Sequence, residues 1–198
     1  MDTLTLHAFG DNDRSGKVRW TCAELGIPVI ERRLRFPEQR QEPYLSLNPL
    51  GAVPCVEYRG QTLGESTAIC QWLAEEHGSA LTRPVGHPQR LEYLWWISAT
   101  SETCEVRLVD ASVSKIGLLP PEVEAIQGRM VKRRIRALAA KAPEQGYLLG
   151  EFSLADIFLA YSVRLGRSLG YLDPELGAAW YQRVRARPAA QTARFFPE

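Results

Sequence analysis

Two short segments of the sequence carry residues suited to binding a small zwitterionic ligand. The first runs from Asn48 to Pro54 and ends in a Val-Pro pair, and the second contains Glu65 followed by Ser66. A proline restricts the residue before it to extended conformations, and an X-Pro bond at the start of a strand is a common place for a cis peptide. We therefore expect a cis bond at Val53–Pro54, with backbone groups of Val53 turned outward to pair with an extended peptide.

The second segment has the features of a helix start. Ile69, Trp72 and Leu73 form an apolar stripe at helical spacing, which makes Ser66 an N-cap or first-turn residue. A helix N-terminus attracts a carboxylate through its dipole and unsatisfied N–H groups, and the Glu65 carboxylate can accept from an ammonium group. Each segment alone is also compatible with a structural role, as a helix cap or a strand start. Their combination at this spacing favours a site for an amino-acid head group.

With these residues the chain resembles the glutathione S-transferases, whose thioredoxin-like domain carries N-P-x-G-x-V-P before a strand and E-S-x-A-I at a helix start. The resemblance implies that Val53, before Pro54, pairs with the cysteinyl backbone of glutathione. It implies that Glu65 and Ser66 hold the γ-glutamyl end. Gln39 lies where relatives often carry a polar side chain for the glycyl carboxylate, although a solvated loop explains that residue equally well.

The loop before the first expected helix is where relatives place a Tyr, Ser or Cys against the glutathione sulfur. Anchoring the likeness on Val18-Arg19 puts Asn12 at this position, and Ser15 follows one helical turn later. Both side chains can donate a hydrogen bond to a thiolate, but a neutral amide cannot take up the proton. Both therefore stay candidates. Structural alternatives are an N-cap for Ser15 and a turn residue for Asn12.

Composition sets limits on the class of protein. The chain has 198 residues, 45% of them hydrophobic, and a net charge of +1, which permits a sizeable core and gives no sign of nucleic-acid binding. Its four cysteines lack CxxC spacing, so neither a redox pair nor a metal site is indicated, and we expect reduced thiols. No leader-like segment or long apolar run occurs, so we expect a cytoplasmic protein without membrane association.

Hydrophobic periodicity predicts two domains, an α/β thioredoxin-like domain at 1–78 and an all-helical domain at 88–198, joined by a linker at 79–87. In the first domain we expect strands at 4–9, 29–34, 53–58 and 61–63, and helices at 15–25, 43–47 and 66–76. In the second we expect helices at 89–114, 121–141, 154–168 and 174–186. Ser153 and Asp156 have the spacing of a capping box. The resemblance extends here, because the family carries S-x-A-D-I at this helix start and a later Arg-Pro pair, here Arg187-Pro188.

Four residues of the first helix of the second domain could line a site for a second substrate. Helical spacing groups Thr100, Thr103 and Arg107 on one face, and Cys104 lies beside them. In relatives this face overlooks the sulfur, and its polar residues would suit a polar or anionic electrophile. Buried cysteine is common and usually inert, so Cys104 is also compatible with a core position.

The family likeness implies a detoxification-type transferase in which the glutathione thiolate attacks an electrophilic small molecule, with glutathione as co-substrate and no metal. It also implies a homodimer. The alternative is a non-catalytic glutathione-binding or protein-interaction member with the same fold, which the Asp11-Asn12-Asp13 loop supports. A thiol-disulfide oxidoreductase would need a cysteine at the start of the first helix, whereas Cys22 lies inside it.

Overall fold

The computed structural model describes residues 2–196, and the chain divides into two compact units. The first unit comprises Met1–Thr82 with Ala186–Glu198, and the second comprises Arg83–Arg185. These units differ from the expected domains at the C-terminus, because the segment from Ala186 groups with the N-terminal unit. The functional division into residues 1–78 and 88–198 stays a prediction.

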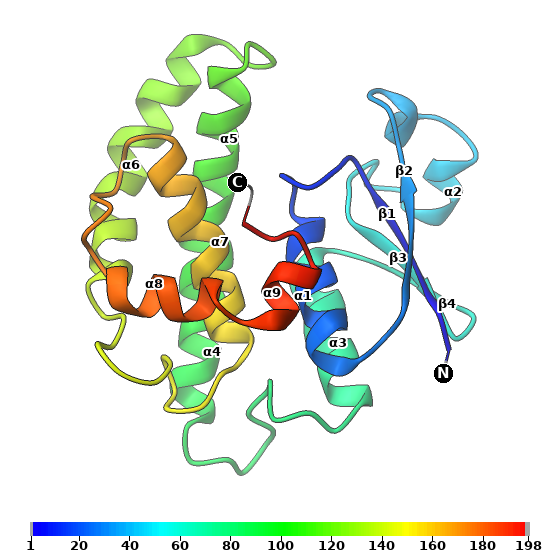
Figure 1. Ribbon diagram of the computed structural model, residues 1–198. Coiled ribbons are helices and arrows are strands. Elements are labelled where there is room, and N and C mark those ends of the chain that lie inside the picture. Colours follow the sequence, from blue (N-terminus) through cyan, green and yellow to red (C-terminus); the bar gives the residue numbers. More distant parts are fainter. Residues whose placement is uncertain (1, 197–198) are drawn as a thin grey trace. The chain divides into compact units, whose positions relative to one another are not determined.

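The first unit is built on a mixed four-stranded sheet in the order β2-β1-β3-β4. Its elements are β1 (Leu4–Ala8), α1 (Ser15–Leu25), β2 (Val29–Arg33), the 3₁₀ turn η1 (Glu38–Arg40), α2 (Tyr44–Leu47), β3 (Cys55–Tyr58), β4 (Gln61–Gly64), α3 (Ser66–Glu76) and the C-terminal α9 (Pro188–Thr192). Helices α1 and α3 pack together on one face of the sheet, and α2 lies on the other (Figure 1). The expected thioredoxin-like arrangement is confirmed.

Local sequence signals account for most element boundaries in this unit. Helix α1 ends where Gly26 adopts a left-handed conformation with φ 67°, which glycine permits without a steric cost. The turn between β3 and β4 is made by Arg59 and Gly60, both with positive φ, as two-residue hairpin turns require. The core between sheet and helices holds fully buried apolar side chains, among them Leu4, Leu6, Val18, Val56, Ile69 and Leu73.

The second unit is helical, as expected. It contains α4 (Arg90–Ser98), a π-helical stretch η2 (Ala99–Glu105), α5 (Val106–Lys115), α6 (Pro121–Ala139), α7 (Leu154–Ser168) and α8 (Ala178–Arg185). Two expectations need correction. The helix predicted at 89–114 changes to π geometry in its middle, and the helix predicted from residue 174 begins at Ala178. Among the described residues, no helix combines the length and apolar character needed to cross a membrane.

The buried centre of the second unit is α7. Ten consecutive residues from Leu154 to Val163 are buried, so this helix is covered on all sides. Its start has the capping box predicted from the sequence, in which the side chain of Ser153 accepts from the backbone of Asp156 and the Asp156 carboxylate accepts from the backbone N–H of Ser153. This cap fixes where the central helix begins.

Candidate functional site

Each of the four strands has one end at the edge of the sheet where the candidate site lies. Strands β1 and β2 are parallel, β3 runs antiparallel to β1, and β4 runs antiparallel to β3. The carboxyl ends of β1, β2 and β4 therefore share an edge with the start of β3. The register pairs His7 with Cys55 and Cys55 with Gly64, so the loops that follow β1 and β4 emerge beside Pro54. Topology thus gathers sequence segments that are far apart in the chain.

The segment before β3 is held in place by side chains of the preceding helix and loop. The peptide bond Val53–Pro54 is cis, as predicted. The carbonyl oxygen of Ala52 accepts hydrogen bonds from the Tyr44 hydroxyl at 2.6 Å and from Nδ2 of Asn48 at 2.8 Å. Among the described residues, Val53 has no hydrogen bond. Its backbone groups are therefore available to an added peptide strand.

Glu65 and Ser66 stand at the start of α3. Glu65 is the N-cap and has φ 65° and ψ 106°, a region that non-glycine residues rarely adopt. Its side chain is exposed, and within residues 2–196 its carboxylate has neither a hydrogen bond nor an ion pair. Ser66 is the first helical residue and is 4% exposed. The backbone strain and the unpaired carboxylate together make this helix start a candidate position for binding a ligand, and that role stays a prediction.

Gln39 belongs to the same edge of the sheet, because it lies in the turn η1 that follows β2. It is only 4% exposed, and its side-chain oxygen is buried without a hydrogen-bond partner in the described chain. This burial argues against the solvated-loop alternative. Gly51 packs against this turn: a Cβ at Gly51 would lie 3.1 Å from the carbonyl oxygen of Gln39, and its φ is 58°. The glycine of the N-P-x-G segment thus lets the two loops approach closely.

The loop after β1 separates the two candidates for thiol activation. Ser15 is fully buried; its hydroxyl donates to the Asp13 carboxylate and accepts from Nη1 of Arg19 at 3.2 Å. It is the first residue of α1, while Arg14 occupies the N-cap without a side-chain cap, so Ser15 is not the N-cap. Asn12 is exposed in the bend before the helix. Only Asn12 therefore presents its side chain to solvent.

Asp13 is the residue that sequence reasoning missed in this loop. Its carboxylate accepts from the backbone N–H groups of Phe9 at 2.7 Å, Gly10 at 3.0 Å and Ser15 at 2.7 Å. An aspartate two residues before a helix commonly accepts from backbone N–H groups in this way, which was the available signal. These three bonds fix the loop that carries Asn12.

The structure does not place the four candidate second-substrate residues on one surface. Thr100 is fully buried, and its hydroxyl lies 2.7 Å from the carbonyl oxygen of Trp96 in its own helix; Cys104 is also fully buried. Thr103 is exposed, and Arg107 donates to Gln127 on α6 at 3.1 Å. The π-helical stretch accounts for the divergence, since its wider turn shifts the faces expected from α-helical spacing. A substrate role for Thr103 and Arg107 stays a prediction.

The four cysteines are buried, so we expect them to resist alkylation. Burial raises the pKa of Cys104 to about 11, partly offset by the charges of Arg134 and Arg107. Burial also raises the pKa of Cys55 to about 11 and that of Cys22 further. The thiolate fraction of Cys104 and Cys55 at neutral pH should thus be roughly a hundredfold below that of a free thiol.

Mass spectrometry after iodoacetamide treatment should find the native protein unmodified and the unfolded protein alkylated at all four positions. Rapid alkylation of native Cys104 would contradict its core position.

Comparison with known proteins connects this arrangement to one family. Residues 14–76 match the family described as glutathione S-transferase, N-terminal domain. The chain is 26% identical over 217 residues to glutathione S-transferase-like protein OpS6 of Beauveria bassiana, with 96% of this chain and 94% of the relative covered. It is 23% identical to probable elongation factor 1-gamma 1 of Arabidopsis thaliana, covering 82% of this chain and 41% of that protein.

A solved structure described as Ure2p in complex with glutathione shares the fold, with a TM-score of 0.83, 19% identity, and coverage of 97% of this chain and 98% of that chain. The fold and the family resemblance expected from the sequence are confirmed together. Residues 14–76 thus match the N-terminal domain of the glutathione S-transferases, and the chain has the glutathione S-transferase fold.

Proposed function

We propose that this protein binds reduced glutathione along the edge of the sheet and promotes attack of its thiolate on an electrophilic small molecule. The observation that carries the proposal is the convergence of four segments at that edge. In the order of the strands they present Gln39 after β2, Asn12 after β1, Val53 before β3, and Glu65 with Ser66 after β4. Neighbouring strands lie about 4.8 Å apart, so four strand ends span roughly 14 Å. An extended tripeptide, roughly 10 Å long, can reach at least three of them.

Each segment offers chemistry that matches one part of the tripeptide. The Glu65 carboxylate accepts from the α-ammonium group of the γ-glutamyl residue, and the start of α3 donates N–H groups to its α-carboxylate. The backbone of Val53 pairs with the cysteinyl residue. The amide of Gln39 donates to the glycyl carboxylate. The glutathione-bound state of the solved Ure2p structure supports this choice of ligand.

Asn12 is the residue that we assign to the sulfur. A hydrogen bond from a neutral amide stabilises the thiolate and lowers the thiol pKa, while the proton leaves to solvent because an amide cannot accept it. The thiolate then forms a bond from sulfur to the electrophilic atom of the second substrate. The electron pair displaced from that atom either leaves with a leaving group or, in an addition to a double bond, takes up a proton from water. Ser15 supports the loop instead, since its hydroxyl is already bonded to Asp13 and Arg19.

We expect Asn12→Ala to lower turnover about ten- to hundredfold, the effect of losing one hydrogen bond to a charged atom, with little change in glutathione affinity. The pH dependence of the thiolate absorbance of bound glutathione should show a raised thiol pKa in this variant. Ser15→Ala is the comparison: it should lower thermal stability but leave that thiol pKa unchanged. A raised thiol pKa in Ser15→Ala alone would reverse the assignment.

Calorimetric titration with reduced glutathione tests the ligand itself. The wild-type protein should bind saturably, and an absence of binding at millimolar glutathione would exclude the proposed function.

The second candidate function is that of a non-catalytic binding or interaction protein. Two observations favour it: the exposed residue at position 12 is an asparagine, which has neither a hydroxyl nor a thiol, and the chain is similar to an elongation factor 1-gamma. Binding without turnover of any electrophile would support it. A homodimer, a cytoplasmic location and a role in detoxification are further expectations of the transferase proposal.

A further inference from the structure

We propose that Arg194 is a positioning residue that holds the loop presenting Asn12, acting through the neighbouring Asp11. The inference rests on the proposed function, because it concerns the loop assigned to the glutathione sulfur. Arg194 lies 183 positions after Asp11 in the chain, on the short segment that follows α9. All residues involved belong to the first compact unit.

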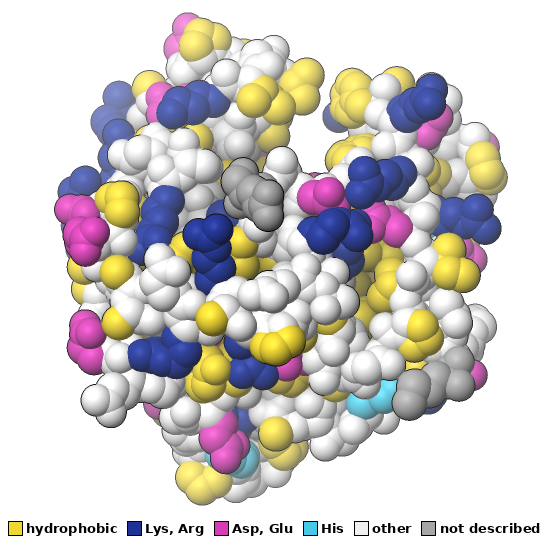
Figure 2. Space-filling view, viewed as in Figure 1, with side chains coloured by type: hydrophobic (Ala, Val, Ile, Leu, Met, Phe, Trp, Pro, Cys, Tyr) yellow, Lys and Arg dark blue, Asp and Glu magenta, His cyan; other side chains and the backbone are white. Residues whose placement is uncertain are grey.

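The contacts of Asp11 form a bridge from the loop to two neighbouring elements. Oδ1 of Asp11 accepts from Nε of Arg194 at 3.2 Å and from its Nη2 at 3.1 Å, and it also accepts from Nη2 of Arg33 at 3.2 Å. Nη2 of Arg194 further donates to Oε2 of Glu31 on β2 at 3.1 Å. Figure 2 shows basic and acidic side chains in contact over this part of the first unit. Arg194 therefore ties the loop after β1 to strand β2.

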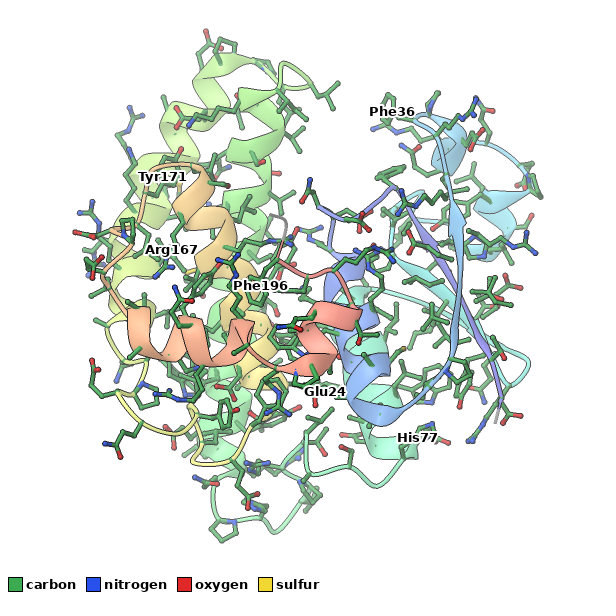
Figure 3. All side chains as sticks on the ribbon, viewed as in Figure 1. Glu24, Phe36, His77, Arg167, Tyr171 and Phe196 are labelled. Atoms are coloured by element: carbon green, nitrogen blue, oxygen red, sulfur yellow. The ribbon has the colours of Figure 1, made fainter. Side chains whose placement is uncertain are left out.

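The C-terminal segment is itself anchored on both sides of Arg194. Before it, Nε and Nη2 of Arg187 each donate to the Glu24 carboxylate at 2.7 Å, and the carbonyl oxygen of Ala193 accepts from Nε of Arg19 at 3.2 Å. After it, Phe195 is fully buried against Trp20, with ring centroids 4.7 Å apart. Glu24 on α1 and Phe196, next along the segment, are labelled in Figure 3. The anchored neighbours give Arg194 a fixed place from which to hold Asp11.

The backbone of Arg194 is consistent with an imposed position. Its φ is 49°, in the left-handed region that favours glycine, and such a conformation persists where neighbouring contacts determine it. Because Arg194 is not a glycine, this backbone conformation costs free energy, and contacts of its side chain must offset that cost. The side chain bonds to both Asp11 and Glu31. The backbone conformation therefore agrees with a side chain that is held against the loop.

The charges around Asp11 keep its carboxylate ionised. Burial by itself would raise the pKa of Asp11, but hydrogen bonding and charge from Arg194, with the charges of Arg19 and Arg33, lower it overall. The Asp11 and Arg194 side chains are 37% and 54% exposed, so their pairing contributes little to global stability. Because Asp13 fixes the other side of Asn12, losing the Asp11 contact should release the loop on one side without unfolding the protein.

The test compares Arg194→Gln with Arg59→Gln in the full chain. Both variants remove one exposed positive charge from a residue that has a positive φ and pairs with two carboxylates, but Arg59 lies in the turn between β3 and β4 and pairs with Asp2 and Glu76. Hydrogen exchange of peptides covering residues 9–14 should become several-fold faster in Arg194→Gln and remain as in wild type in Arg59→Gln. Turnover should fall about tenfold in Arg194→Gln with an unchanged affinity for glutathione, because small misplacements of a catalytic group are costly. The thiol pKa of bound glutathione should rise in the same variant.

Reciprocal and conservative variants sharpen the comparison. Asp11→Asn should reproduce the faster loop exchange. The double variant Asp11→Asn with Arg194→Gln should exchange little faster than either single variant. Arg194→Lys should show an exchange rate between those of wild type and Arg194→Gln. Equal loop exchange in Arg194→Gln and Arg59→Gln would overturn the inference. If wild type shows no bound thiolate, the proposed catalysis fails, while the exchange comparison still decides whether Arg194 holds the loop.

Discussion

Replacing Glu65 by glycine should make the protein more stable while strongly lowering its affinity for glutathione. Glu65 has φ 65° and ψ 106°, and holding a non-glycine residue in such a region costs about 1 to 3 kcal/mol. Glycine relieves that strain but loses more backbone entropy on folding, by about 0.5 to 1 kcal/mol. The net expectation is a gain of about 1 kcal/mol, or a rise in Tm of a few degrees. Thermal denaturation measures it directly.

The binding side of this prediction follows from the carboxylate. Within the described chain the Glu65 carboxylate has no partner, so its removal sacrifices no contact within the protein. It would remove the acceptor for a ligand ammonium group, and losing a charged hydrogen bond of about 1.5 to 3 kcal/mol lowers affinity roughly ten- to hundredfold. Glu65→Ala should lose the same affinity without the gain in stability. Calorimetric titration with glutathione compares both variants with wild type.

Glu76→Ala is the matched control, because Glu76 lies at the far end of the same helix and its removal changes the net charge equally. It should bind glutathione as wild type does. Wild-type affinity in Glu65→Gly would remove Glu65 from the site. A loss of stability in Glu65→Gly would show that the unusual backbone conformation carries no strain.

The largest loss of stability is expected from Asp156→Ala at the start of α7. Oδ1 of Asp156 accepts from the backbone N–H of Leu148 at 3.0 Å and from Nε1 of Trp180 at 2.8 Å, and Oδ2 accepts from the N–H of Ser153 at 3.1 Å. Asp156 is fully buried, and burial raises its pKa against the opposing effect of these donors. Alanine would leave three donors unsatisfied in the interior.

An unsatisfied buried donor costs about 1 to 3 kcal/mol, so the three together should cost about 3 to 5 kcal/mol after relaxation. For a chain of this size that corresponds to a fall in Tm of roughly 10 °C. Asp173→Ala is the control: Asp173 accepts one backbone bond, from Glu175 at 2.9 Å, in an exposed turn. It should change Tm by no more than a few degrees. A small effect of Asp156→Ala on Tm would mean that water enters the site and accepts the hydrogen bonds that the carboxylate accepts in the wild-type protein.

Local signals in the sequence were sufficient for many elements. The helices at 15–25, 66–76 and 154–168 were predicted with the bounds that the structure has, because each begins or ends at a residue with a strong local preference: Gly26, Ser66 and Ser153. The cis bond at Val53–Pro54 was also expected, since proline makes that conformation accessible. Errors fell where a preference was weak, as at the start of α8, or where packing changed helix geometry, as in η2.

The sequence by itself determined the family resemblance, the two classes of secondary structure and the segments that we propose for a ligand site, because motifs, periodicity and turn residues act over a few positions. Only the tertiary structure decided which side chains of those segments face solvent. It buried Ser15 and left Asn12 exposed. It also brought Arg194 to Asp11, 183 residues away. Such pairings depend on strand order and packing, which no local pattern specifies, and the resulting difference in burial is the reason why we propose Asn12, and not Ser15, as the residue at the sulfur.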